Sequence, residues 1–98
     1  MEMIEYIEEN YDKELTITTM SEKFGYSGEH FCRKFKDATG LTPMKYLQIY
    51  RMEEANKLLK MGERHIGKIA EQCGFTDSNY FTRCFKKHFG MPPSHLKI

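Results

Sequence analysis

The sequence predicts an all-α fold of about seven helices, in which two helix-turn-helix subdomains are joined by one long linker helix. Three observations support this prediction. Apolar residues recur at the spacing of helix faces and never with the strict alternation of a strand. The pattern of the first half returns in the second half. Glycines fall where each expected helix should stop.

The internal repeat emerges when residues 15–46 are compared with residues 64–96. The segments align at an offset of 49 as far as a shared glycine, and at an offset of 50 after one inserted residue. Two copies are too few for a solenoid, so we interpret them as one supersecondary unit present twice. The nine identical pairs are Ile17 and Ile66, Glu22 and Glu71, Gly25 and Gly74, Phe31 and Phe81, Arg33 and Arg83, Phe35 and Phe85, Lys36 and Lys86, Gly40 and Gly90, and Pro43 and Pro93.

An amphipathic first helix is expected over about residues 2–11, with Ile4 and Ile7 turned toward the core. This start of the chain is acidic, because residues 1–14 hold six acids and one base, which gives −5. The net charge of the whole chain is +1, so the remaining residues carry +6. A small total therefore hides a basic body, and a basic body is what a phosphate backbone attracts.

Each repeat is expected to form a helix-turn-helix, because a short helix, a glycine-containing turn and a second helix follow one another. In the first copy the helices are expected over about 17–24 and 28–39, with Ser27 as the N-cap. Gly25 between them can take the left-handed conformation that ends a helix. In the second copy the helices are expected over about 66–73 and 78–89, with Gly74 in the turn, Thr76 or Asp77 as the N-cap, and a final short helix from Pro93.

A long helix is expected between the copies, over about residues 43–61. Thr42 is its expected N-cap and Pro43 suits the first helical position. We therefore divide this single domain into a first homeodomain-like subdomain with the N-terminal helix (1–42), the linker helix (43–61) and a second such subdomain (62–98). The apolar face of the linker consists of Leu47, Tyr50, Leu58 and Leu59.

The second helix of each copy has an aromatic face and a polar face when it is projected at about 100° per residue. The expected buried stripes are Phe31, Phe35 and Ala38 in one copy and Phe81, Phe85 and Phe89 in the other, with His88 at the edge. Arg forks onto guanine, Asn onto adenine, Glu accepts from cytosine and Thr meets several base edges, so the polar faces predict base reading in a DNA major groove. These faces consist of Glu29, Cys32, Arg33 and Lys36, and of Asn79, Thr82, Arg83 and Lys86.

The length of the linker helix predicts two neighbouring reading positions. About 19 residues at about 1.5 Å each give about 28 Å, and successive major-groove openings on one face of DNA lie about 34 Å apart. With the thickness of the helices added, one chain is expected to place both second helices in adjacent turns.

A family resemblance covers nearly the whole chain. In the first half it is carried by Phe24, Gly25, Tyr26, Ser27, Phe31, Arg33, Phe35, Lys36, Gly40, Pro43, Tyr46, Arg51, Ala55, Leu58 and Leu59. In the second half it is carried by Ile66, Ile69, Ala70, Gly74, Phe75, Tyr80, Phe81, Arg83, Phe85, Lys86, Gly90, Pro93 and Ser94. With these residues the chain resembles the DNA-binding domain of the AraC/XylS family of bacterial transcription regulators.

The resemblance implies regulation of transcription by a seven-helix domain that binds two successive major grooves of double-stranded DNA as a monomer and bends the DNA. It also implies contact with RNA polymerase, in a cytoplasmic bacterial protein that is nucleoid-associated when bound. Family members usually carry an N-terminal ligand-sensing domain or the receiver domain of a response regulator, so we expect a fragment of a longer chain rather than a stand-alone regulator. The implied base contacts are Glu29, Cys32 and Arg33 in the first copy and Ser78, Asn79, Tyr80, Thr82 and Arg83 in the second.

Other function classes lack a supporting pattern. Residues 62–68 mimic a phosphate-binding loop, but Ile69 stands where Ser or Thr should hold magnesium, and no strand precedes the loop. Cys84 and His88 are spaced like a metal pair, yet two further ligands are lacking and packing against the core accounts for both. The cysteines form no C-x-x-C pair, no apolar run is long enough for a membrane span, the acidic start predicts no secretory signal, and no histidine lies in a catalytic motif. We therefore expect no enzyme activity, cofactor, metal or membrane association.

One competing function class is a helical protein-interaction module that contacts RNA polymerase or another regulator. The two classes differ in their response to salt. A DNA binder should be retained on heparin and lose affinity linearly with the logarithm of salt concentration, whereas a pure protein adaptor should not.

Overall fold

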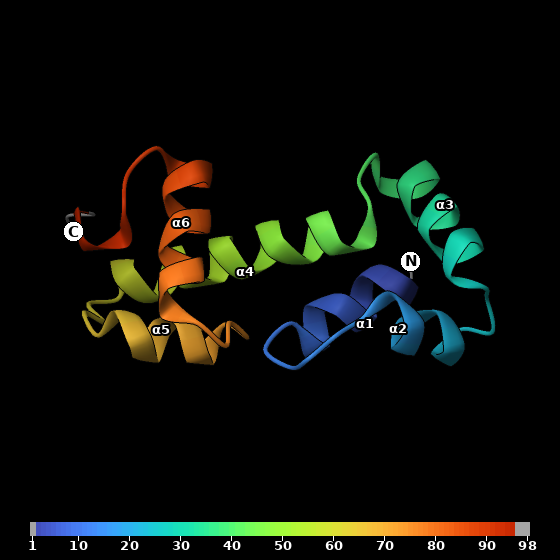
Figure 1. Ribbon diagram of the computed structural model, residues 1–98, viewed down its shortest axis with the longest axis horizontal. Helices are drawn as coiled ribbons and strands as arrows, with labels where there is room; N and C mark the ends of the chain where they lie inside the picture. The colour runs from blue at the N-terminus through green and yellow to red at the C-terminus, as the bar shows by residue number, and fades with distance from the viewer. Residues whose placement is uncertain (1, 96–98) are drawn as a thin grey trace. The chain divides into compact units, whose positions relative to one another are not determined.

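The computed structural model describes residues 2–95, and within this part of the chain every regular element is a helix (Figure 1). The all-α prediction is confirmed, with the difference that the last of the seven expected helices is a single 3-10 turn. Four predicted helices end one residue early, mostly because the residue before a glycine is the C-cap and not part of the helix. The elements are α1 (Glu2–Asn10), α2 (Ile17–Lys23), α3 (Gly28–Thr39), α4 (Pro43–Lys60), α5 (Ile66–Gln72), α6 (Ser78–Phe89) and η1 (Pro93–His95).

The chain folds as two compact units that divide within α4, one reaching as far as Gln48 and the other beginning at Ile49. The first unit holds α1, α2, α3 and the first part of α4, and the second holds the remaining elements. The predicted subdomain 62–98 ends in residues 96–98, which lie outside the described residues. None of the helices described is both long enough and apolar enough to cross a membrane.

The core of the first unit forms around Phe31 and Phe35, which are both fully buried. Their spacing of four residues puts them on one face of α3. Tyr46 meets Phe35 edge-on with ring centroids 5.5 Å apart, and its hydroxyl donates a 2.6 Å hydrogen bond to the carboxylate of Glu8. This bond ties α1 to the start of α4 inside the unit. The other buried residues of this core are Met3, Ile7, Leu15, Met20 and Leu47.

The second unit repeats this arrangement with Phe81 and Phe85 on α6, again fully buried. The two rings lie 5.8 Å apart, and Phe75 from the turn lies 5.1 Å from Phe81. Burying aromatic side chains of this size is the main stabilising contribution that such a small unit has available. The residues buried with them are Met52, Ala55, Leu59, Ile69, Ala70, Cys73 and Cys84.

Both turns close with the same hydrogen bonds around a glycine of positive φ, +74° at Gly25 and +89° at Gly74. The backbone N–H of the residue after each glycine bonds to a carbonyl five residues earlier, which is the Schellman arrangement. A side chain at either glycine would be strained by the backbone conformation itself. The closing bonds run from Tyr26 to Ser21 and from Phe75 to Ala70, each 2.9 Å long.

The N-caps follow the sequence prediction and settle the alternative left open in the second copy. The Ser27 hydroxyl accepts a backbone N–H from the first turn of α3 at 3.1 Å, and Thr42 does the same for α4 at 3.3 Å. Asp77, and not Thr76, caps α6, with its carboxylate accepting an N–H at 2.8 Å. A missing cap of this kind costs a helix about 1 kcal/mol.

Two residues that the helical projection placed on the buried stripe are exposed, so the prediction is wrong for Ala38 and for His88. Both lie in the last turn of a helix of 12 residues, whereas the helix packed against it, α2 or α5, has only seven. Helices of a helix-turn-helix cross at a steep angle, as α5 and α6 do in Figure 1, so the shorter helix covers only the first part of its partner and the last turn extends beyond it. His88 instead approaches Glu53 of α4, with Nε2 3.2 Å from the carboxylate oxygen Oε1.

Replacing Phe85 with Ala should lower the free energy of unfolding by about 3–5 kcal/mol, because it empties the centre of the second unit. Thermal denaturation followed by circular dichroism measures the change. Met61→Ala is the matched control, since Met61 is 82% exposed and should change stability by less than about 0.5 kcal/mol. Equal melting of Phe85→Ala and the unchanged chain would show that the core is placed incorrectly.

Candidate nucleic-acid interface

The polar face of α3 is open to solvent, as the helical projection predicts. Glu29, Arg33 and Lys36 are exposed and Cys32 is half-buried. Glu29 Oε1 lies 3.7 Å from Arg33 Nη2, and the two side chains are 89% and 65% exposed. An ion pair this exposed adds little to stability, but it holds an anion beside the arginine that is expected to read bases. The charge of Arg33 is therefore partly balanced before any ligand arrives.

The polar face of α6 is also accessible, and it is organised differently. Thr82 is half-buried and donates a 2.9 Å hydrogen bond to the Ser78 carbonyl, so its hydroxyl is anchored to the helix. The Arg83 guanidinium carbon lies 5.8 Å from the centre of the Tyr80 ring, within the range of a cation–π contact. The remaining predicted residues of this face, Asn79 and Lys86, are exposed.

The two helices differ in charge. Helix α3 holds three bases and two acids, which gives +1, whereas α6 holds three bases and no acid, which gives +3. The basic side chains of α6 include two consecutive lysines in its last turn, Lys86 and Lys87. Electrostatic attraction to a polyanion is therefore stronger at α6 than at α3.

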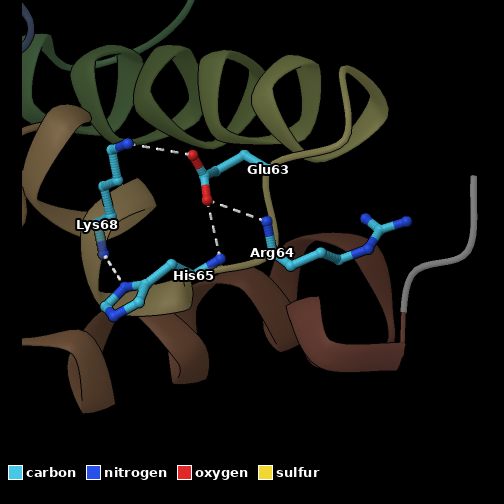
Figure 2. Close-up of polar contacts among 4 residues, drawn as sticks. All are labelled: Glu63, Arg64, His65 and Lys68. Atoms are coloured by element: carbon cyan, nitrogen blue, oxygen red, sulfur yellow. Dashed lines mark hydrogen bonds and ion pairs between the residues drawn. The ribbon is translucent and has the colours of Figure 1, made fainter.

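A polar cluster at Glu63 fixes the start of the second helix-turn-helix, and Figure 2 shows its contacts. One carboxylate oxygen of Glu63 accepts the backbone N–H groups of Arg64 and His65 at 3.1 and 3.0 Å. The other lies 3.5 Å from the Lys68 ammonium. The His65 ring in turn caps α5, because Nδ1 accepts the backbone N–H of Lys68 at 3.0 Å. The cluster thereby holds the first turn of α5, the helix that packs against α6.

The sequence analysis missed this cluster, although the internal repeat contains a signal for it. At the offset of 49, His65 corresponds to Thr16, and the Thr16 hydroxyl caps α2 by accepting the N–H of Thr19. An N-cap was therefore due at position 65, where histidine is an unusual choice. The hydrogen bond from the His65 backbone N–H lowers the pKa of Glu63 below its ordinary value of 4.5, and the charge of Lys68 acts in the same direction.

The chain matches a family described as a helix-turn-helix domain over residues 20–97. It is 38% identical over 97 residues to the HTH-type transcriptional activator RhaS of Mannheimia succiniciproducens, an alignment that covers 99% of this chain and 36% of RhaS. The chain thus spans about a third of the length of the curated relatives it matches.

Solved structures with the same fold include the C-terminal domain of the two-component response regulator yesN from Fusobacterium nucleatum. Its TM-score is 0.89 at 39% identity, with 94% of this chain and 91% of that chain covered. A probable AraC family transcriptional regulator from Rhodopseudomonas palustris has a TM-score of 0.80 at 29% identity, covering 94% and 87%. The DNA-binding domain of AdpA, solved with a target DNA, shares the fold with a TM-score of 0.90 at 24% identity, covering 95% and 84%.

The low pKa of Glu63 predicts a stability difference that depends on pH. A carboxylate with a lowered folded-state pKa stabilises the fold above its unfolded-state pKa, and this stabilisation is lost as the pH falls through the folded-state pKa. Glu63→Gln should therefore destabilise the chain near neutral pH, and the gap to the unchanged chain should shrink below pH 4.5. Chemical denaturation at a series of pH values measures the gap.

The matched control is Glu71→Gln, the same chemical change at an exposed position on α5. It should leave the free energy of unfolding nearly unchanged at neutral pH. A gap for Glu63→Gln that stays constant between neutral and acidic pH would contradict the proposed contribution of its ionised form.

Proposed function

Because the chain belongs to the AraC/XylS family of transcription regulators, as one of their helix-turn-helix DNA-binding domains, we propose that it reads double-stranded DNA with α3 and α6 in two successive major grooves. The single observation that carries this proposal is the repeated helix with a buried phenylalanine pair and an accessible face of arginine, lysine and hydrogen-bonding residues. A solvated charged face on one helix would be unremarkable for a small protein. The same face on two copies of one motif supports a shared ligand with a regular repeat.

The proposed readers follow from the chemistry of base edges. In α6, Arg83 suits the two acceptors of guanine and Asn79 suits adenine, with Thr82 beside them. In α3, Arg33 has the same role, while Glu29 accepts from a cytosine amino group. Contacts to phosphate hold such a helix in register on DNA. Lys36 and Lys86, which the repeat aligns with each other, supply these contacts. The proposed contact residues are Glu29, Cys32, Arg33 and Lys36, and Ser78, Asn79, Tyr80, Thr82, Arg83 and Lys86.

The length of α4 supports binding to successive grooves. Its 18 residues give about 27 Å at about 1.5 Å per residue. One helical turn of DNA measures about 34 Å, and the added thickness of the reading helices makes up the difference. A protected region confined to a single turn of DNA in a footprinting experiment would contradict this part of the proposal.

The proposal also includes two partners other than DNA: an N-terminal domain in the full-length protein, and RNA polymerase. The relatives that the chain matches are about three times as long, and the yesN domain is the C-terminal part of a response regulator. An N-terminal sensor or receiver domain would therefore deliver the signal, and RNA polymerase would receive it. The protein acts in the bacterial cytoplasm and is associated with the nucleoid when bound.

A salt titration distinguishes the proposed DNA binding from the competing function, a protein-interaction module that does not bind DNA. We expect retention on heparin, and a dissociation constant for duplex DNA that rises linearly in a plot of log Kd against log salt concentration. The proposed function would be overturned if the chain were not retained on heparin and did not associate with mixed duplexes at low salt.

Replacing Arg83 with Ala should remove discrimination at one base pair, at a cost of about 1–3 kcal/mol, because the guanidinium fork fits one base and not the others. Selection of bound sites from a pool of random duplexes, before and after the substitution, shows which base pair loses its preference. Arg33→Ala should act at a second position, about one turn of DNA away.

Lys57→Ala is the matched control for loss of one positive charge, because Lys57 pairs with Glu54 on α4, outside both reading faces. It should leave the selected sequence unchanged. If Arg83→Ala weakened binding to all duplexes equally, Arg83 would contact phosphate and not a base.

A further inference from the structure

We propose that Tyr80 is a positioning residue whose ring holds the Arg83 guanidinium in place for base reading, so that Tyr80 contributes to specificity through Arg83. This inference rests on the proposed function, and it assigns to Tyr80 a role different from the direct base contact that the family resemblance implies. It is carried by an arrangement of rings and cations in the second unit.

The arrangement begins at the surface of α6. Tyr80 and Arg83 are three residues apart and therefore neighbours on one side of the helix. The guanidinium carbon lies 5.8 Å from the centre of the ring, and the Tyr80 side chain is 48% exposed. An arginine side chain has four rotatable bonds, so a flat ring beside its planar end removes much of the freedom that base reading would otherwise have to restrict.

The ring of Tyr80 is itself held from below. It packs against Phe75 with ring centroids 6.1 Å apart, and Phe75 is buried against Phe81 in the core. The guanidinium of Arg51 on α4 lies 5.7 Å from the centre of the Phe75 ring. The ring beside Arg83 is therefore connected to the core through Phe75.

In the first unit, the ring and the arginine at the corresponding positions have other neighbours. His30 corresponds to Tyr80 and stacks on Tyr26, with centroids 4.9 Å apart and planes inclined by only 6°. Arg33, the counterpart of Arg83, lies 3.7 Å from the carboxylate of Glu29. The repeat therefore provides an internal comparison: one arginine lies beside a ring, which leaves its charge uncompensated, and the other lies beside an acid.

The test is a double-substitution cycle with Tyr80→Leu, Arg83→Ala and the combination of the two. The probe is a duplex that the unchanged chain selects from a pool with a randomised centre of about 30 base pairs, enough for two half-sites one turn apart. The readouts are the dissociation constant for the selected duplex and its ratio to the dissociation constant for duplexes altered at the base pair where Arg83→Ala loses its preference. Circular dichroism confirms that each variant is folded.

We expect Tyr80→Leu to reduce the preference at that base pair by about 2- to 30-fold, the range of an exposed to a desolvated cation–π contact. In the Arg83→Ala background, where that preference is already lost, the same substitution should leave the dissociation constant for the selected duplex unchanged. Tyr80→Phe, which keeps the ring and removes the hydroxyl, should retain the preference. The control His30→Leu should show no such coupling to Arg33→Ala, because Glu29 holds that arginine.

Three results would overturn the inference. One is a Tyr80→Leu variant with full preference. Another is a double variant in which the two losses of affinity for the selected duplex multiply, which is the result expected if Tyr80 contacts the DNA independently. The third is a Tyr80→Phe variant as impaired as Tyr80→Leu. If the unchanged chain selects no duplex at all, the proposed function fails; if selection succeeds and the cycle is multiplicative, only the role of Tyr80 fails.

Discussion

In each unit, the structure depends on burying two phenylalanines that are four residues apart on one helix. Phe31 and Phe35 turn one side of α3 into the core, and Phe81 and Phe85 do the same for α6. Because one side of each helix is buried, the polar side chains lie on the opposite, solvent-exposed side. The accessible face of each second helix is thus a geometric result of how its core is filled. The chemistry of that face can change without disturbing the packing beneath it.

The sequence was sufficient to predict the fold because repetition and periodicity report the same arrangement. The bounds of α3 and α6 agree with the prediction at both ends, since Ser27 and the shared glycines mark them chemically. The accessible positions on both helices were also predictable, because a projection at helical spacing shows which side faces outward.

Periodicity failed where the outcome depends on the partner and not on the helix itself. It describes directions around an axis but not how far along that axis a neighbour extends, so Ala38 and His88 were assigned to the core and are exposed. The cap at His65 was predictable from its alignment with Thr16. The contacts of Glu63 were not, because they depend on where the loop before α5 places its backbone N–H groups. The contact between the Tyr80 ring and Arg83 was not predicted either, because it depends on how the side chains pack.

The two copies share one scaffold and present different electrostatic surfaces. The first carries an acid next to its arginine, whereas the second carries no acid on α6 and has two lysines in its last turn, Lys86 and Lys87. Two copies of a motif in one chain can differ in function in this way, because the residues that differ lie on the exposed faces and the core residues that both copies need are retained. Helix α6 of the second copy attracts a polyanion strongly. In the first copy the attraction is weaker, because Glu29 partly balances the charge of Arg33.

The cap of α6 gives that helix an electrical direction. Asp77 places a negative charge at the amino end, while Lys86 and Lys87 place positive charges at the carboxyl end. The amino ends of many helices attract phosphate, but the carboxylate at this one repels it. A polyanion beside α6 is therefore repelled from the amino end of the helix and attracted to its carboxyl end, so the choice of an aspartate cap decides which part of the helix can lie against phosphate.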